Sequence, residues 1–81
     1  MLRLFHKLFI MELYIFKTNI MSQEKAISLN SIFNQDENIR RWTIDTEDVD
    51  NVLKIEVENS ISEIELIEGI KQKGYECEVL P

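Results

Sequence analysis

The sequence contains one cysteine, one proline, two glycines and one histidine among its 81 residues. A lone cysteine excludes an internal disulfide and a multi-cysteine zinc site, and it fits a reducing compartment, so we expect a cytoplasmic protein. The one histidine, His6, lies outside the segments with strand and helix patterns. No Ser-His or Cys-His pair can therefore be assembled within those segments. We predict that the chain is not an enzyme.

Basic residues are also few, because nine lysines and arginines stand against fifteen acids for a net charge of -6. An acidic surface repels phosphate backbones, so nucleic acid is not an expected partner. No stretch holds the roughly 20 apolar residues that a membrane span needs. The hydrophobic share of 44% and the length of 81 residues indicate one small globular domain.

The first ten residues differ from the rest, because they combine Leu and Phe with basic residues and contain no acid. Glu12 interrupts the apolar run and no small-residue cleavage pattern follows, which argues against a signal peptide. A short basic amphipathic anchor is the alternative. We expect residues 1–10 to be an extension and residues 11–81 to be the domain, and the translation start, Met1 or Met11, stays open.

Deleting residues 1–10 is predicted to leave the melting temperature nearly unchanged, because the extension is expected to lie outside the fold. Thermal unfolding of the full and shortened chains tests this. A large drop on deletion would mean that the extension packs into the domain.

Periodicity predicts four strands and two helices. Residues 12–19, 39–45, 52–58 and 75–80 have strand composition or strict alternation, and residues 22–34 and 61–73 repeat apolar residues at helical spacing. Ser22 is a suitable N-cap, Ser60 with Glu63 fits a capping box, and Gly74 is a natural helix stop. The order β-α-β-β-α-β predicts an α+β, ferredoxin-like sandwich with two helices on one face of a four-stranded antiparallel sheet.

Side-chain parity divides the residues between a core and an open sheet face. Leu13 and Ile15 are expected on the face away from the helices, partly exposed. The residues expected to be mostly buried between sheet and helices are Phe16, Leu29, Phe33, Trp42, Ile44, Ile55, Ile64 and Ile67.

Three short motifs occur in this order: Ile20-Met21-Ser22 after the first strand, Ile39-Arg40-Arg41-Trp42-Thr43-Ile44-Asp45 in the second, and Lys73-Gly74-Tyr75-Glu76 before the last. In this respect residues 12–81 resemble a heavy-metal-associated (HMA) domain, the fold of small copper chaperones and of the N-terminal modules of metal-pumping ATPases. The resemblance implies a ferredoxin-like fold and a metal-chaperone ancestry.

The resemblance also implies where a metal would bind, at two cysteines spaced CxxC in the loop after the first strand. Matching the buried helix positions of the family places Ser22 and Lys25 there. Two thiolates hold Cu(I) because soft metals prefer sulfur, whereas a serine is a hard, weak ligand and a lysine cation repels a metal. A register shifted by one offers Gln23 and Ala26, which is no better. We predict that the metal site is lost and that Ser22 only caps a helix.

The other candidates are weaker. Cys77 on the last strand is expected to be a small buried hydrophobic residue, and Met21 offers a single thioether, which binds metal weakly. The resemblance implies that Tyr75 flanks the loop of Ser22 and Lys25. The acids of residues 45–50 do not match a calcium loop, because its sixth position lacks glycine, and they predict a solvated hairpin turn.

The sequence therefore predicts a small cytoplasmic domain without a cofactor that contacts another protein. The contact would use either the open sheet face or the loop face, defined as Ser22, Lys25 and Tyr75. The alternative function is residual binding or transport of Cu(I), or of another soft metal, by Cys77 thiols from two chains of an oligomer.

Overall fold

The computed structural model describes residues 11–58 and 61–80. The predictions about residues 1–10 and about Ser60 lie outside these ranges. In chain order the elements are β1 (Met11–Thr18), α1 (Gln23–Ala26), the 3₁₀ helix η2 (Ile27–Leu29), α2 (Asn30–Phe33), β2 (Ile39–Asp45), β3 (Val52–Glu58), α3 (Glu63–Gln72) and β4 (Cys77–Val79).

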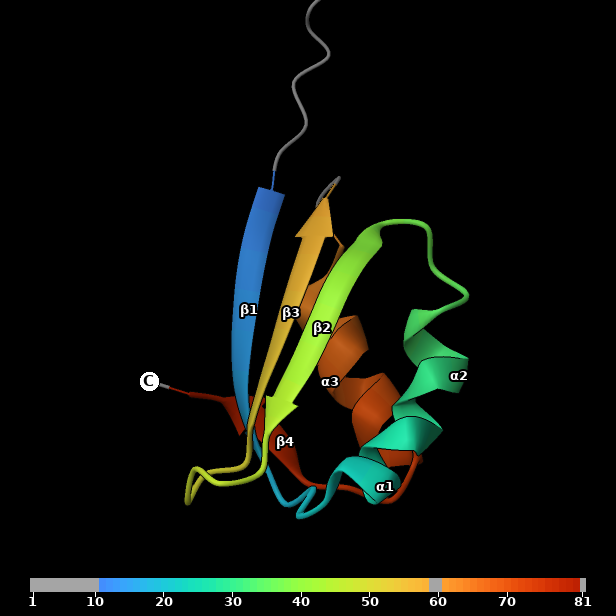
Figure 1. Cartoon of the computed structure of the whole chain (residues 1–81). Coiled ribbons are helices and arrows are strands. Elements are labelled where there is room, and N and C mark those ends of the chain that lie inside the picture. The colour runs from blue at the N-terminus through green and yellow to red at the C-terminus, as the bar shows by residue number, and fades with distance from the viewer. Residues whose placement is uncertain (1–10, 59–60, 81) are drawn as a thin grey trace, which may run out of the picture.

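The strands form a four-stranded sheet in the order β2-β3-β1-β4, and every neighbouring pair is antiparallel. The helical segments all lie on one side of this sheet (Figure 1). The predicted α+β class, with a four-stranded antiparallel sheet and two helical regions, is therefore confirmed. The arrangement is compatible with a ferredoxin-like fold.

The predicted strand 39–45 and the predicted strand 52–58 agree with β2 and β3, and β1 begins and ends one residue earlier than predicted. The last strand is shorter than the predicted 75–80, because the residues before it bond elsewhere. Tyr75 N donates to Ile70 O at 3.5 Å, and Glu76 N donates to Asn19 Oδ1 at 2.9 Å. Gly74, with a φ of 98°, turns the chain after α3 as predicted.

The prediction of one continuous helix over 22–34 is wrong, because the structure divides this region into α1, η2 and α2. Two serine hydroxyls explain the division. Ser28 Oγ donates to Lys25 O at 3.0 Å, and Ser31 Oγ donates to Ser28 O at 3.0 Å. Such side-chain bonds compete with the helical ladder, and a 3₁₀ turn is the usual tighter substitute.

The second helix begins later than predicted, because Ser62 rather than Ser60 is its N-cap. Ser62 Oγ accepts a hydrogen bond from Glu65 N at 3.2 Å. Leu66 and Ile70 then face the sheet, with exposed fractions of 5% and 0%. Ile64 lies two residues before Leu66, on nearly the opposite side of a helix with 3.6 residues per turn. The prediction that Ile64 is buried is therefore wrong, and 66% of it is exposed.

The core lies between the sheet and the helical layer. Trp42 and Ile67, both predicted to be mostly buried, are only partly buried at its margin. The Trp42 ring meets the Phe33 ring edge-on, with centroids 5.1 Å apart. The other predicted core residues are confirmed as buried, namely Phe16, Leu29, Phe33, Ile44 and Ile55.

Candidate functional site

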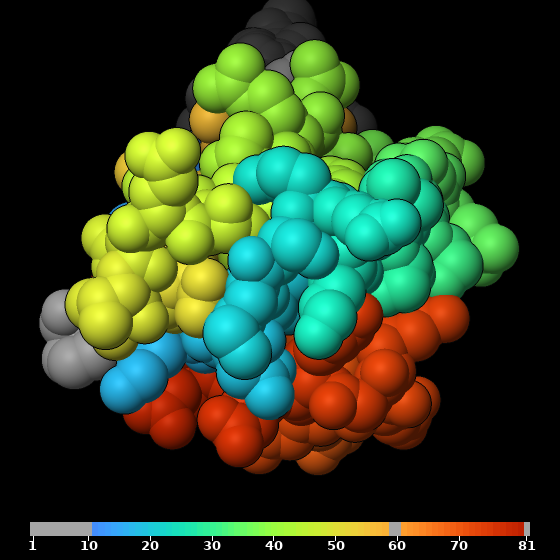
Figure 2. All heavy atoms as spheres, turned by 60° about the horizontal axis from the view of Figure 1, so that its bottom comes forward, coloured from blue at the N-terminus to red at the C-terminus, as the bar shows by residue number. Residues whose placement is uncertain are grey.

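The loop face lies at the end of the molecule where the chain leaves β1. Figure 2 shows this end, with the segment that enters α1 between the β2–β3 turn and the end of α3. Ser22 has an extended backbone, and its Oγ accepts a hydrogen bond from Lys25 N at 3.1 Å. The prediction that Ser22 caps the helix is thus confirmed. The Ser22 hydroxyl oxygen is therefore hydrogen-bonded to the backbone N–H of Lys25, the residue at the other predicted metal-ligand position.

Tyr75 reaches the same place from the far end of the chain. Its hydroxyl donates to Lys25 O at 3.0 Å and lies 3.2 Å from Ser28 Oγ. The structure therefore brings Ser22, Lys25 and Tyr75 together, as the resemblance implied. Both hydroxyls of this trio are already used: the Ser22 hydroxyl caps α1, and the Tyr75 hydroxyl holds the first helical region to the segment after α3.

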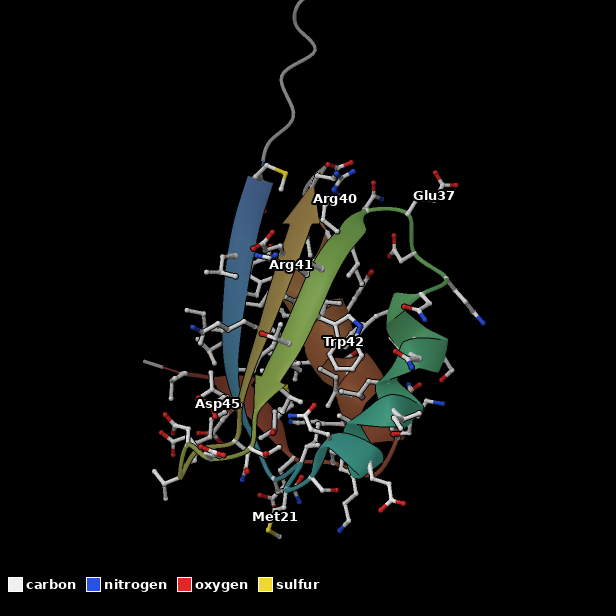
Figure 3. The ribbon with its side chains drawn as sticks, in the orientation of Figure 1. Met21, Glu37, Arg40, Arg41, Trp42 and Asp45 are labelled. Carbon is white, nitrogen blue, oxygen red and sulfur yellow. The ribbon has the colours of Figure 1, made fainter. Side chains whose placement is uncertain are left out.

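Met21 stands at the tip of this loop, with 66% of its surface exposed. Figure 3 shows its side chain at the extreme end of the molecule, directed away from the sheet and helices. Within residues 11–58 and 61–80, no group of three or more His, Cys, Asp or Glu side chains is placed to hold a metal ion. Met21 is an exposed apolar side chain at the end of the molecule that carries the loop face.

Cys77 is part of the core and only 3% exposed, which confirms the prediction of a buried hydrophobic residue. Burial is the main cause that raises the pKa of its thiol to about 11, while nearby Lys71 lowers it and Glu78 raises it. The thiol is therefore neutral at pH 7, whereas metal binding requires the thiolate. Sharing Cys77 between two chains would first require uncovering it.

The raised pKa of Cys77 predicts a decline in stability at alkaline pH. The folded thiol keeps its proton to about pH 11, whereas the unfolded thiol loses its proton near pH 9.0, so unfolding releases a proton in between. Stability is therefore full below pH 9 and falls as the pH rises through this window. Urea titrations from pH 7 to 11 should show the fall, and it should be smaller in Cys77→Ala. An equal fall in both proteins would contradict the assignment to Cys77, since Tyr14, whose pKa is also raised, is shared by both.

The same cause predicts a slow reaction of Cys77 with a disulfide reagent. At pH 8 a thiol of pKa about 11 holds about 100-fold less thiolate than one of pKa 9.0. The native rate should therefore be lower than the rate in denaturant by at least that factor, because burial also limits access. Comparable rates in the two states would show that the thiol is open to solvent.

The acids of the β2–β3 turn are used to build the turn. Asp45 Oδ1 accepts a hydrogen bond from Glu47 N at 3.0 Å, and Asp48 Oδ1 accepts one from Asp50 N at 2.9 Å. Val49 between them is 90% exposed. These bonds stabilise a local hairpin turn, as predicted from the missing calcium-loop pattern.

The open sheet face is the side of the sheet opposite the helical segments. β1 places Leu13 on it with 52% of its surface exposed and Ile15 beside it partly exposed, as predicted. Arg41 Nη2 of β2 pairs with Glu56 Oε2 of β3 at 2.9 Å across the same face. A shallow hollow lies here, lined by Leu13, Arg41, Trp42, Thr43, Lys54 and Glu56. This hollow could not be predicted from the sequence, because it depends on which β2 residue lies opposite which β3 residue.

No family model, no curated protein and no solved structure matches the chain. The resemblance to HMA domains thus stays a prediction that rests on the motifs themselves. Within the described ranges no helix is long and apolar enough to cross a membrane.

Proposed function

We propose that this chain is a ferredoxin-like domain of metal-chaperone ancestry that has lost its CxxC metal site and acts as a protein-interaction module through its open sheet face. The observation that carries the proposal is the exposure of β1. Met11 and Leu13 are 53% and 52% exposed, and no helical segment covers their side of the sheet in the described part of the chain. Exposed apolar side chains that are grouped on one face are typical of contact surfaces.

The composition of the loop face supports loss of metal carriage. Its two ligand positions hold a serine that caps α1 and a lysine whose ammonium repels cations. A thiolate pair is the feature that gives a small exposed loop its affinity for Cu(I). We propose that this end of the domain keeps the geometry of a metal loop without its ligands.

The open sheet face is also a better contact surface than the loop face. The Tyr75 and Ser22 hydroxyls already bond to atoms of their own chain, so a partner would have to compete for them. Leu13, by contrast, loses contact with water at no such cost when a partner covers it. The charged pair Arg41–Glu56 beside it would form part of a polar rim.

A photo-crosslinking experiment tests the proposed function. Leu13 is replaced by benzoylphenylalanine in the full chain inside the host cell, and Ile27, which is 62% exposed but lies in the helical layer, is replaced in a matched control. We expect a discrete crosslinked product from position 13 and none from position 27. Equal labelling from both positions, or no product from position 13, would contradict an interaction through this face.

A further inference from the structure

Lys54 lies in the middle of the open sheet face. β3 is an inner strand, and its register places Lys54 between Ile15 of β1 and Thr43 of β2. Side chains alternate along a strand, so Lys54 points away from the side on which Leu53 and Ile55 are fully buried. Its two cross-strand neighbours are an apolar side chain and a hydroxyl. The sheet therefore places a lysine at the centre of this face with no opposite charge directly beside it.

The other basic residues of the sheet are paired, whereas Lys54 is not. Each of them has an acidic partner within 3.9 Å, namely Lys17, Arg40 and Arg41. All fifteen acidic side chains of the sequence belong to residues 11–58 and 61–80, and in those ranges none of them forms an ion pair with Lys54. Residues 1–10 contain no acid. A carboxylate for Lys54 would therefore come from another molecule.

The hollow beside Lys54 has an excess of positive charge. Its charged lining residues are Arg41, Lys54 and Glu56, and Glu56 Oε2 already accepts a hydrogen bond from Arg41 Nη2. The remaining positive charge lies beside Leu13, which is 52% exposed. The whole chain has a net charge of -6, so the hollow differs in sign from the surface around it and favours a negatively charged group.

Covering the open sheet face would take the Lys54 ammonium out of water. A buried charge is strongly unfavourable without a partner and is tolerated when it is paired and hydrogen-bonded. A lysine at the margin of a contact can keep its ammonium in water. Lys54 is on an inner strand, however, so a partner that packs on Leu13 and Ile15 lies over Lys54 as well. Such a partner has to supply the opposite charge.

We propose that the partner of the open sheet face places an acidic side chain, flanked by apolar residues, in the hollow beside Leu13, where its carboxylate pairs with Lys54. The flanking apolar side chains would pack on Leu13 and Ile15. This inference rests on the proposed function and names the chemistry of the partner. A second copy of the chain suits the face less well, because each copy carries a net charge of -6.

The first test is an NMR titration of the isotope-labelled full chain with a capped seven-residue peptide that has a central glutamate between leucines. The same peptide with glutamine in place of glutamate is the matched control. We expect the glutamate peptide to shift the amide resonances of Leu13, Thr43 and Lys54. It should bind roughly fivefold more tightly than the control, because only the carboxylate gains from the ammonium. Equal binding of the two peptides, or no shift with either, would overturn the proposal.

Lysine variants show whether the preference comes from Lys54 itself. Lys54→Met keeps an unbranched apolar side chain and removes the charge, and Lys54→Arg keeps the charge. Lys17→Met is the matched control, because Lys17 is on the same face but lies 3.9 Å from Asp50. We expect the preference for glutamate to disappear in Lys54→Met and to persist in the other two variants. Equal losses in Lys54→Met and Lys17→Met would assign the effect to the overall charge and overturn a specific pair.

Crosslinking in the host cell separates this inference from the proposed function. Benzoylphenylalanine is placed at Met11, which is 53% exposed on the same face and does not line the hollow. We expect the crosslinked product to be lost in Lys54→Glu. A product that persists in Lys54→Glu would overturn the inference and leave an interaction through the open sheet face intact. No product from the chain with Lys54 would contradict the proposed function as well. A product made only of two copies of the chain would assign the face to a second copy instead.

Discussion

Replacing Phe33 with alanine is expected to lower the free energy of unfolding by about 3–5 kcal/mol. Phe33 is 1% exposed, closes the last turn of α2, and packs edge-on against Trp42 with the ring centroids 5.1 Å apart. Its removal takes away buried apolar surface and leaves a cavity. It also removes the aromatic partner of Trp42, whose own ring is only partly buried. A domain of 81 residues buries a small core, so this loss is a large part of its total stability.

Urea denaturation of Phe33→Ala beside Ile64→Ala measures the effect with an internal reference. Ile64 is 66% exposed, so its truncation should change stability by less than about 0.5 kcal/mol. A loss below about 1 kcal/mol for Phe33→Ala would show that this side chain is not part of the core. A large loss for Ile64→Ala would show that the outer side of α3 is covered in solution.

The sheet could be predicted from the sequence more fully than the helices, for a physical reason. In β3 every second side chain is apolar, and only one assignment of the two faces buries Leu53, Ile55 and Val57 together. In the predicted helix 61–73 the isoleucines at 61, 64, 67 and 70 offered a second apolar stripe at a spacing of three. That spacing drifts around a helix of 3.6 residues per turn, and the stripe through Leu66 and Ile70 is the one that packs on the sheet.

The first helical region could not be predicted in detail, because its division depends on side-chain hydrogen bonds. Ser28 and Ser31 fit a helical pattern by position, yet each hydroxyl bonds to a backbone carbonyl three residues earlier. The candidate site was predicted better. The cap at Ser22 and the burial of Cys77 followed from residue type, and the place of Tyr75 beside Lys25 agrees with what the resemblance implied.

The start of the last strand was not predicted correctly, because it depends on tertiary hydrogen bonds. The composition of residues 75–80 is that of a strand throughout, but Tyr75 and Glu76 bond to Ile70 and Asn19 instead of to β1. These tertiary bonds make β4 begin at Cys77, two residues later than predicted.

Changing Ser22 and Lys25 together to cysteine is expected to create Cu(I) binding in a chain that otherwise has none. The unmodified chain should fail to compete with a moderate Cu(I) chelator, because its thiol is buried and neutral and its loop offers a hydroxyl and an ammonium. Residues 22 and 25 are already adjacent, since Ser22 Oγ lies 3.1 Å from Lys25 N. Two thiols there would lie at the first turn of α1, whose unpaired N–H groups favour the thiolate form.

Competition with the chelator, followed by its absorbance, measures the gain, and each single cysteine variant is a matched control that should bind much more weakly. Repeating the experiment with Cys77→Ser shows whether the buried thiol contributes. Loss of the Ser22 cap should cost about 0.5–2 kcal/mol, so thermal unfolding must show that the double variant is folded. Tight Cu(I) binding by the unmodified monomer would contradict the proposed loss of the metal site and support a function in metal transport. Cu(I) binding by the unmodified chain that appears only on dimerisation and disappears in Cys77→Ser would favour a site shared between two chains. Cys77 is the single cysteine of the unmodified chain, so each copy would supply one thiol.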